Sequence, residues 1–198
     1  TLYIDGKKVE GDLVIPYGPR IINDFAFFGC EDLTSVTIYS VTHINGRAFA
    51  YCTALTSGTI PACITYIGND AFYGCDNLTN VYYTGDISSW CEFEYCKELM
   101  LINTGETEKK SITLYIDGTK VEGSLTIPDG VTRIGSYAFY ECKDLKFITI
   151  SSSVTKIGDS AFERLSNAQG NINFRGTIEQ WNAIEKGNNW RKNMWPYR

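Results

Sequence analysis

The chain has 198 residues, of which 43% are hydrophobic and 14% aromatic, and its formal net charge at pH 7 is -5. This composition is that of a folded protein with a sizeable core, and it excludes a disordered or collagen-like chain. The negative charge disfavours nucleic acid as a partner, and no apolar run approaches the roughly 20 residues that insertion into a membrane requires. Because the chain starts at Thr1 rather than at methionine, we interpret it as a mature or excised piece of a longer protein.

The first predicted element is a β-hairpin at the start of the chain. Residues 1–6 read Thr-Leu-Tyr-Ile-Asp-Gly. Asp-Gly between alternating residues is a strong signal for a two-residue hairpin turn. The same six residues recur at 113–118, so a second hairpin is expected over 113–122.

A short unit then repeats along the chain, and each copy contains an Ala-Phe pair. The aligned phenylalanines are Phe27, Phe49, Phe72, Phe139 and Phe162, and the adjacent copies among them lie 22 or 23 residues apart; a weaker copy lies at Phe93, two periods before Phe139. A fixed period in this range is typical of solenoids, whose windings are stable only when they stack on one another. We expect these phenylalanines to stack as an aromatic spine inside the solenoid.

Two further columns of the repeat have a predicted role. Four residues before the phenylalanine stands Asn23, Asn45, Gly68, Gly135 or Gly158. Asn and Gly tolerate positive φ, which predicts a left-handed turn at this position. The stretch that follows each cysteine, such as residues 33–38, alternates apolar and polar residues and predicts a strand with one buried face.

The strand positions indicate one α+β repeat fold. They fall at Leu13, Val36, Gly58, Val81, Ile102, Leu125, Ile148 and Ile172. We expect a curved parallel sheet of about eight short strands, with turns or short helices on the convex side. The solenoid is predicted to run continuously over residues 1–198, with sub-modules 1–103 and 113–198 and a polar loop over 104–112. The hairpin at 113–122 is expected to replace the convex side of one winding.

A second duplicated segment predicts helices. Residues 81–90 match residues 172–181, and Asp86 and Thr177 are candidate N-caps. Gln180 completes a capping box for Thr177. Ile178, Trp181 and Ile184 follow at helical spacing, which predicts a short helix that lays a tryptophan over the C-terminal end of the stack.

The repeat unit resembles the BspA-type leucine-rich repeat of bacterial surface proteins. The best matches to that pattern are residues 127–135, Ile-Pro-Asp-Gly-Val-Thr-Arg-Ile-Gly, and residues 60–81, and the resemblance covers nearly the whole chain. The sequence departs from the pattern at Tyr39 and Ser151, where proline is expected, at Gly58 in a buried strand, and at Leu165 in the cysteine column. The resemblance implies a leucine-rich-repeat solenoid in a secreted or cell-surface protein, with roles in adhesion, host-protein binding or display of other domains.

The cysteines and the histidine, which could carry chemistry, are better explained as structural residues. Five of the seven cysteines occupy one repeat column: Cys30, Cys52, Cys75, Cys96 and Cys142. A parallel row of side chains one strand spacing apart suits neither tetrahedral zinc nor a disulfide, so we expect buried, inert thiols. A bridge between Cys63 and Cys91 stays open. The single histidine, His43, is expected in a solvated turn, and we predict no catalytic residue, no metal site, no cofactor and no enzymatic activity.

The solvent-facing rows of the strands form the candidate binding surface. Its residues are Tyr17, Ser35, Thr37, Tyr39, Ser57, Thr59, Asn80, Tyr82, Phe147 and Thr149. Serine and threonine also suit any solvated sheet, which is the simpler interpretation. The aromatic residues favour a ligand, because exposed rings on a rigid surface are effective anchors.

Three functions fit this sequence. We expect an extracellular or surface-exposed protein-binding module for adhesion, whose partner is a host protein or another surface protein. A glycan-binding module is the alternative. The third is a spacer or display stalk, or a module that accompanies a catalytic domain elsewhere in the parent protein.

Overall fold

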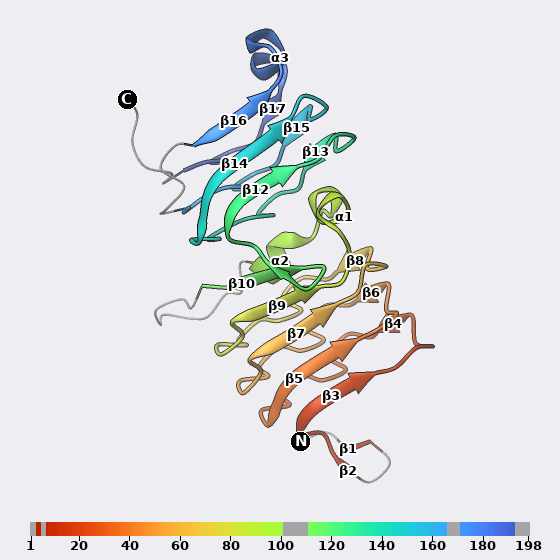
Figure 1. Cartoon of the computed structure of the whole chain (residues 1–198). Coiled ribbons are helices and arrows are strands. Elements are labelled where there is room, and N and C mark those ends of the chain that lie inside the picture. The colour runs from red at the N-terminus through yellow and green to blue at the C-terminus, as the bar shows by residue number, and fades with distance from the viewer. Residues whose placement is uncertain (1–2, 5–6, 101–110, 166–170, 193–198) are drawn as a thin grey trace. The chain divides into compact units, whose positions relative to one another are not determined.

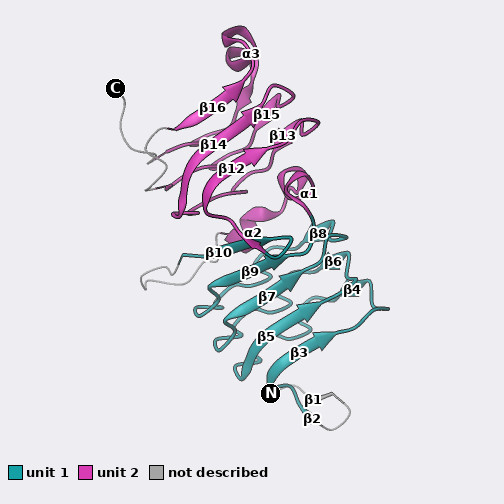
Figure 2. Cartoon of the chain, in the orientation of Figure 1, with its two compact units in different colours: residues 1–85, 101–118 teal, residues 86–100, 119–198 magenta. Residues whose placement is uncertain are grey.

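The computed structural model describes residues 3–4, 7–100, 111–165 and 171–192. They form two compact units, which are coloured separately in Figure 2. Unit 1 comprises residues 1–85 and 101–118, and unit 2 comprises residues 86–100 and 119–198. Both units are parallel β-solenoids in which most windings pass once through a main sheet and once through a narrow sheet of two-residue strands (Figure 1).

Unit 1 has a parallel main sheet. Its strands lie in the order β3 (Gly11–Ile15), β5 (Leu33–Ile38), β7 (Ser57–Ile60), β9 (Asn80–Tyr83) and β10 (Thr113–Ile116). The narrow sheet contains β4 (Ile21–Ile22), β6 (His43–Ile44) and β8 (Tyr66–Ile67), and β1 (Tyr3–Ile4) pairs with β2 (Lys7–Lys8) in an antiparallel hairpin. The register places Val36 beside Leu13 and Gly58, as the repeat period predicts.

Unit 2 repeats this arrangement and contains the helices. Its main sheet contains β12 (Gly123–Ile127), β14 (Leu145–Ser151) and β16 (Ile172–Arg175), and its narrow sheet contains β13 (Arg133–Ile134), β15 (Lys156–Ile157) and β17 (Glu185–Lys186). The helices are α1 (Ile87–Glu92), α2 (Cys96–Met100) and α3 (Ile178–Ala183), and the short strand β11 spans Thr119–Lys120. The convex side therefore consists mainly of short strands and tight loops.

The predicted aromatic spine is present in both units. The ring of Phe49 stacks between Phe27 and Phe72, with centroid distances of 5.0 and 5.3 Å and interplanar angles of 8° and 6°. In unit 2, Phe139 and Phe162 stack at 5.4 Å and 8°. Phe49, Phe139 and Phe162 are fully buried, so consecutive windings share one apolar interior.

The prediction of a left-handed turn four residues before each phenylalanine is wrong. None of the five residues of that column has positive φ, whereas residues two before and two after the phenylalanine do, such as Arg47 (φ 53°) and Tyr51 (φ 60°). At Gly68, glycine is needed for space, because a Cβ there would lie 2.5 Å from the backbone nitrogen of Gly46. The actual left-handed residues point backbone groups toward the adjacent winding, where Arg47 N donates to Asn69 O at 3.1 Å and Tyr51 N donates to Tyr73 O at 2.7 Å.

The predicted location of the second hairpin is also wrong. Its first strand, β10, pairs in parallel with β9 and so lies in the main sheet rather than on the convex side. Leu114 and Ile116 are buried there, as in any other strand of the stack. The Asp-Gly turn itself is confirmed, with φ of 47° at Asp117 and 70° at Gly118. The predicted strand at Ile102 and most of the predicted loop, residues 104–110, lie outside the described residues.

The predicted helix caps are confirmed, but the predicted packed face of α3 is wrong in part. Ser89 N donates to the Asp86 carboxylate at 2.8 Å, and Thr177 and Gln180 form a capping box at the start of α3. Trp181 packs against Phe174 and Trp190, with centroid distances of 5.3 and 5.9 Å. Ile178 is 64% exposed and therefore does not share the packed face with Trp181, contrary to the prediction.

Candidate binding surface

The candidate surface in unit 1 consists of adjacent rows on the main sheet. Ser35, Ser57 and Asn80 lie side by side on β5, β7 and β9. Thr37, Thr59 and Tyr82 form the next row, which continues to Tyr115 on β10. All of these side chains are half-buried or exposed. The structure therefore brings six of the predicted residues together on one face of one unit.

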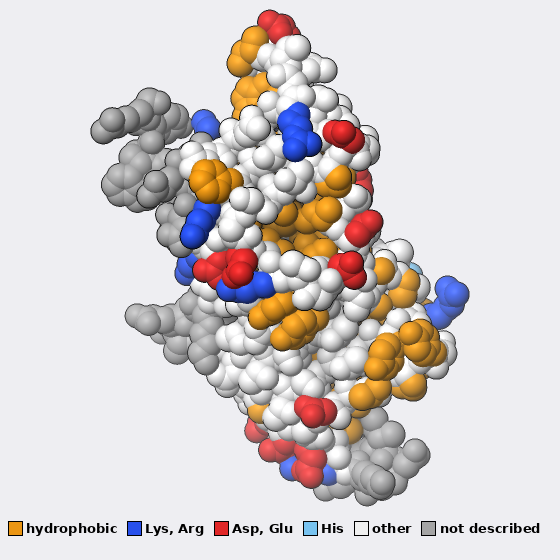
Figure 3. All heavy atoms as spheres, viewed as in Figure 1, with side chains coloured by type: hydrophobic (Ala, Val, Ile, Leu, Met, Phe, Trp, Pro, Cys, Tyr) orange, Lys and Arg blue, Asp and Glu red, His pale blue; other side chains and the backbone are white. Residues whose placement is uncertain are grey.

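A stacked tyrosine pair lies at the β9–β10 end of this surface. The rings of Tyr82 and Tyr115 have centroids 4.5 Å apart and an interplanar angle of 23°. Tyr82 is 37% exposed and Tyr115 is half-buried. Figure 3 shows apolar side chains gathered over β9 and β10. Tyr115 was missed because residues 113–122 were predicted on the other side of the winding; the alternation of apolar Leu114 and Ile116 indicates a strand with a buried face but does not identify β9 as its partner.

A second stacked pair follows the ends of β3 and β5. Tyr17 and Tyr39 stack with a centroid distance of 5.1 Å and an interplanar angle of 17°. They are 75% and 47% exposed. Ser40 next to this pair accepts a hydrogen bond from Gly18 N at 3.3 Å. The two predicted residues at the strand ends thus form one aromatic feature.

Phe147 and Thr149 belong to unit 2 and form a separate candidate surface. Phe147 lies beside Ser124 on β12 and is 52% exposed, while Thr149 lies between Thr126 and Asn173. The predicted residues therefore divide between the two units. Each unit offers its own face, and Phe147 is the large exposed apolar side chain on that of unit 2.

Unit 1 carries a further aromatic cluster that the sequence analysis did not identify. Phe25 contacts Phe28, Phe28 contacts Tyr51, and Tyr51 contacts Tyr73, with centroid distances of 5.6, 5.4 and 5.3 Å. Phe25, Phe28 and Tyr51 are 44–54% exposed. These residues occupy variable positions of the repeat around the Ala-Phe pair. Their shared aromatic character in successive copies was the available signal.

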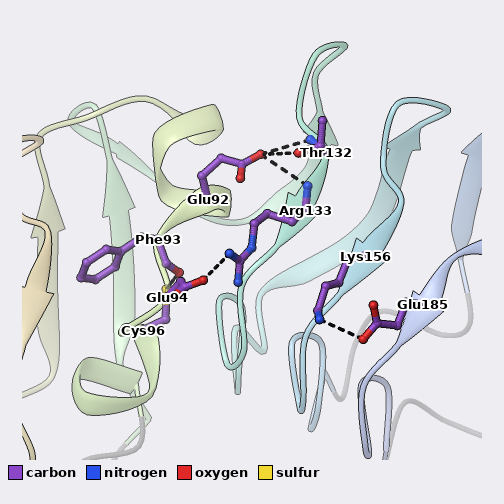
Figure 4. Close-up of polar contacts among 8 residues, drawn as sticks. All are labelled: Glu92, Phe93, Glu94, Cys96, Thr132, Arg133, Lys156 and Glu185. Atoms are coloured by element: carbon purple, nitrogen blue, oxygen red, sulfur yellow. Dashed lines mark hydrogen bonds and ion pairs between the residues drawn. The ribbon is translucent and has the colours of Figure 1, made fainter.

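Charged groups mainly connect neighbouring windings, as Figure 4 shows for unit 2. The Glu92 carboxylate accepts hydrogen bonds from the backbone nitrogens of Thr132 and Arg133 at 3.1 and 3.4 Å. Glu94 forms an ion pair with Arg133, and Lys156 forms one with Glu185 at 2.8 Å. These contacts use the carboxylates to hold adjacent windings together.

His43 is part of the narrow sheet of unit 1 rather than of a solvated turn. It lies in β6, is half-buried, and its Nδ1 is 2.9 Å from the Thr42 hydroxyl. Its ring centroid is 5.9 Å from that of Tyr66. In these contacts the neighbours of His43 are thus a threonine and a tyrosine.

The cysteine column is buried, as predicted. Cys52 and Cys75 donate their thiols to the carbonyl oxygens of Phe27 and Phe49 in the preceding winding, at 3.2 and 3.1 Å. All seven cysteines are free thiols, including exposed Cys63 and buried Cys91. In the part of the chain that the structure describes, no three His, Cys, Asp or Glu side chains are grouped to hold a metal ion. The helices within these same ranges are too short or too polar to cross a bilayer.

Comparison with known proteins identifies the repeat. The family model described as the BspA type leucine rich repeat region matches residues 8–116 and 117–184, with six copies. No curated protein matches the sequence.

The solved structures that are similar to this chain include three leucine-rich repeat proteins. A leucine rich cell surface protein from Faecalibacterium prausnitzii A2-165 is 28% identical, with a TM-score of 0.41; the match covers 89% of this chain and 62% of that one. The T. pallidum leucine rich repeat protein is 21% identical, with a TM-score of 0.40 and coverage of 93% and 69%. A leucine-rich repeat protein from Eubacterium ventriosum ATCC 27560 is 19% identical, with a TM-score of 0.38 and coverage of 86% and 60%.

The chain therefore spans less than two thirds of the Faecalibacterium protein. The family model matches most of the length of this chain. This chain belongs to the BspA-type leucine-rich repeat family.

Proposed function

We propose that the chain is a non-catalytic binding module and that the main-sheet face of unit 1 is its binding surface. The observation that carries this proposal is the stacked pair of Tyr82 and Tyr115 beside rows of serine, threonine and asparagine. Membership of this repeat family supports a binding or display role for the chain. The side chains of the exposed rows are the ones that a partner could contact.

The physical argument is preorganisation. Tyr82 and Tyr115 stand on hydrogen-bonded parallel strands, and each ring restricts the movement of the other. A partner that packs on them therefore loses little additional side-chain entropy at this surface. Aromatic anchors of this kind each contribute about 2 kcal/mol or more at protein interfaces. The adjacent Thr37 and Thr59 hydroxyls supply hydrogen bonds around the apolar centre.

The geometry of the pair favours a protein partner over a glycan. Sugars pack on the open face of an aromatic ring, and the stacking of Tyr82 on Tyr115 covers one face of each ring. Tyr17 and Tyr39 are stacked in the same way. A partner then meets ring edges and phenolic hydroxyls beside the remaining ring faces, and the edges and hydroxyls suit the side chains and backbone of a protein. Phe147 of unit 2 is the residue on which a glycan would be sought.

This role fits an extracellular or cell-surface location, with a host protein or another surface protein as the partner. The similar Faecalibacterium protein is described as a cell surface protein. We further propose that the solenoid is continuous over residues 1–198 and that a parent protein displays it. A spacer without a ligand of its own is the competing role.

The experiment is affinity capture with a matched pair of double variants. The wild type, Tyr82→Ala/Tyr115→Ala and Phe25→Ala/Phe28→Ala are each presented to membrane and surface proteins from host and bacterial cells. Binding of the captured partner is then measured by interferometry. The first variant is expected to weaken binding by about 30-fold or more, the equivalent of one such anchor. The second removes two exposed rings elsewhere on unit 1 and should bind as the wild type does.

Equal binding by all three proteins would refute the assignment of this face. A glycan array in parallel, read with wild type and Phe147→Ala, tests the alternative. Hits that Phe147→Ala abolishes would favour glycan binding over the proposal. A chain that captures nothing on either platform would favour the spacer.

A further inference from the structure

Unit 1 carries aromatic rings in three consecutive loops, each of which follows a strand of the narrow sheet. These loops span residues 23–30, 45–52 and 68–75. Backbone hydrogen bonds join neighbouring loops: Gly29 N donates to Ala50 O at 2.8 Å, and Tyr51 N donates to Tyr73 O at 2.7 Å. Tyr51 therefore lies in the middle loop of a stack of three. Its ring is 44% exposed although a loop lies on either side, so the exposed part faces outward from the stack.

The rings of this cluster meet edge to face rather than in a parallel stack. The ring of Tyr51 is inclined by 71° to that of Phe28 and by 81° to that of Tyr73, with centroid distances of 5.4 and 5.3 Å. In an edge-to-face contact, one ring of the pair presents only its edge, so its partner covers neither of its faces. Phe28 and Tyr51 are each 44% exposed. The cluster therefore keeps ring faces available to a ligand.

Tyr51 occupies a position at which glycine is less strained. Its φ is 60°, and the matching residues of the loops on either side are Gly29 and Gly74, with φ of 66° and 71°. A tyrosine in this left-handed conformation costs conformational free energy that a glycine does not. Gly74 also leaves room for the ring, because a Cβ there would lie 2.8 Å from Tyr51 Cδ1. Strained residues of this kind cluster at functional sites, which points to a ligand for the exposed ring.

An exposed ion pair lies near the ring of Tyr51. Arg47 Nη2 is 3.2 Å from Asp70 Oδ2, and the two side chains are 53% and 45% exposed. Partial burial raises the pKa of the Tyr51 phenol, and among the smaller contributions Arg47 lowers this pKa and Asp70 raises it. Both charges therefore act on Tyr51. The pair offers donor N–H groups and acceptor oxygens side by side, without a net charge.

We propose that this cluster binds a neutral sugar residue of a glycan. The C–H face of a pyranose ring is apolar, and its hydrogens are attracted to the negative face of an aromatic ring. The hydroxyls at the edge of the sugar then meet Arg47 as a donor and Asp70 as an acceptor. Because these two charges neutralise each other and the chain has a net charge of -5, the cluster offers no attraction to an acidic glycan. This site is separate from the main-sheet face that is proposed to bind a protein.

The test is an array of immobilised neutral, sialylated and sulfated oligosaccharides, probed with the full chain. The chain is expected to bind neutral oligosaccharides that contain galactose, glucose or N-acetylglucosamine. Calorimetric titration with a soluble form of the most strongly bound neutral oligosaccharide then gives the dissociation constant. Tyr51→Gly removes the ring and places a glycine where positive φ favours it. This variant should unfold near the wild-type temperature but bind the oligosaccharide at least about tenfold more weakly.

A second variant tests the ion pair without disturbing the backbone. Asp70 has a φ of 58°, a conformation that asparagine tolerates well. Asp70→Asn keeps a hydrogen-bonding side chain but removes the charge, and it should weaken binding of the same oligosaccharide about fivefold. Tyr17→Ala is the control, because it removes an exposed ring outside the cluster, and it should bind the oligosaccharide as the wild type does.

A chain that binds none of the neutral oligosaccharides overturns the proposal, and so does binding that Tyr51→Gly leaves unchanged. Binding restricted to sialylated or sulfated oligosaccharides also overturns it, because charge rather than the aromatic rings would then select the ligand. Repeating the capture experiment with enzymatically deglycosylated proteins separates this site from the main-sheet face. Tyr51→Gly should capture the same protein as the wild type, and loss of that protein would show that the cluster binds a protein instead of a sugar.

Discussion

The indole Nε1 of Trp90 donates a hydrogen bond to the carbonyl oxygen of Ala138 at 2.9 Å, across 48 residues of sequence. Trp90 is fully buried at the end of α1, and Ala138 precedes the spine residue Phe139 in the next Ala-Phe repeat of unit 2. The bond ties the helix to the loop that follows β13. The helix is thereby built into the stack as part of a winding.

This bond predicts the cost of replacing Trp90. Trp90→Phe keeps an aromatic ring but leaves the buried Ala138 carbonyl without its donor, which costs about 1–3 kcal/mol of unfolding free energy. Chemical denaturation followed by circular dichroism measures the change. Trp181→Phe is the control. Trp181 is half-buried, and Lys186 Nζ lies 4.7 Å from the centroid of its ring, so replacing the indole should lower the unfolding free energy by less than about 1 kcal/mol. Equal losses in the two variants would contradict this account of α1.

Two glycines are expected to respond in opposite directions to the same substitution. Gly68→Ala places a Cβ 2.5 Å from Gly46 N and 2.8 Å from Asn45 C, both backbone atoms, and should destabilise the protein by about 1–3 kcal/mol. Gly58→Ala meets only Val36 Cγ1 at 3.5 Å, an ordinary contact in a buried strand, and should be neutral or stabilising by up to about 1 kcal/mol. Thermal unfolding of both variants decides the matter. Destabilisation by Gly58→Ala would show that this strand has no spare room.

The repeat was predictable because its core columns are local and periodic. Phenylalanine every 22 or 23 residues implies a stacked spine, and the registers of β3, β5, β7 and β9 follow from the same period. The role of Gly68 was misread, because composition alone does not separate a residue chosen for positive φ from one chosen for close approach. Arg47 and Tyr51 adopt the left-handed conformation because hydrogen bonds to the next winding stabilise it, and that stabilisation is not visible in residue type.

The binding surface was predictable in part for a related reason. Strand alternation correctly placed Thr37, Thr59 and Tyr82 on the exposed face. It could not place Tyr115, because the period breaks before residue 113 and the strand pairing there is set by packing rather than by spacing.

The N-cap of α1 predicts a pH-dependent contribution to stability. Hydrogen bonds from the backbone and hydroxyl of Ser89 lower the pKa of the Asp86 carboxyl. A carboxyl whose pKa is lower in the folded state stabilises the fold at pH values above its unfolded pKa of about 3.9, and this stabilisation disappears as pH falls through the folded value. Asp86→Ala should therefore cost about 1 kcal/mol at pH 7 and less at pH 2–3.

Asp86→Asn is the matched control, since asparagine caps a helix without titrating. Its unfolding free energy should lie close to that of the wild type at pH 7, and the small difference should vanish in acid. The measurement is urea denaturation at several pH values. A gap between wild type and Asp86→Ala that widens in acid would show that the charged cap does not stabilise α1.

The cysteines predict a single fast-reacting thiol. Cys63 is exposed, and the other six cysteines are buried. Burial raises the pKa of the Cys142 thiol to about 12 and also raises the pKa values of Cys91 and Cys96, so these thiols are protonated at neutral pH and unreactive as nucleophiles. Titration of the native protein with a chromogenic disulfide reagent should release one equivalent rapidly, and the remainder only after denaturant is added. Cys63→Ser should abolish the fast phase.

Rapid reaction of a second thiol would contradict this prediction. The stacked phenylalanines and the backbone of adjacent windings shield the cysteine column, so a second fast thiol would mean that the windings open locally on the timescale of labelling.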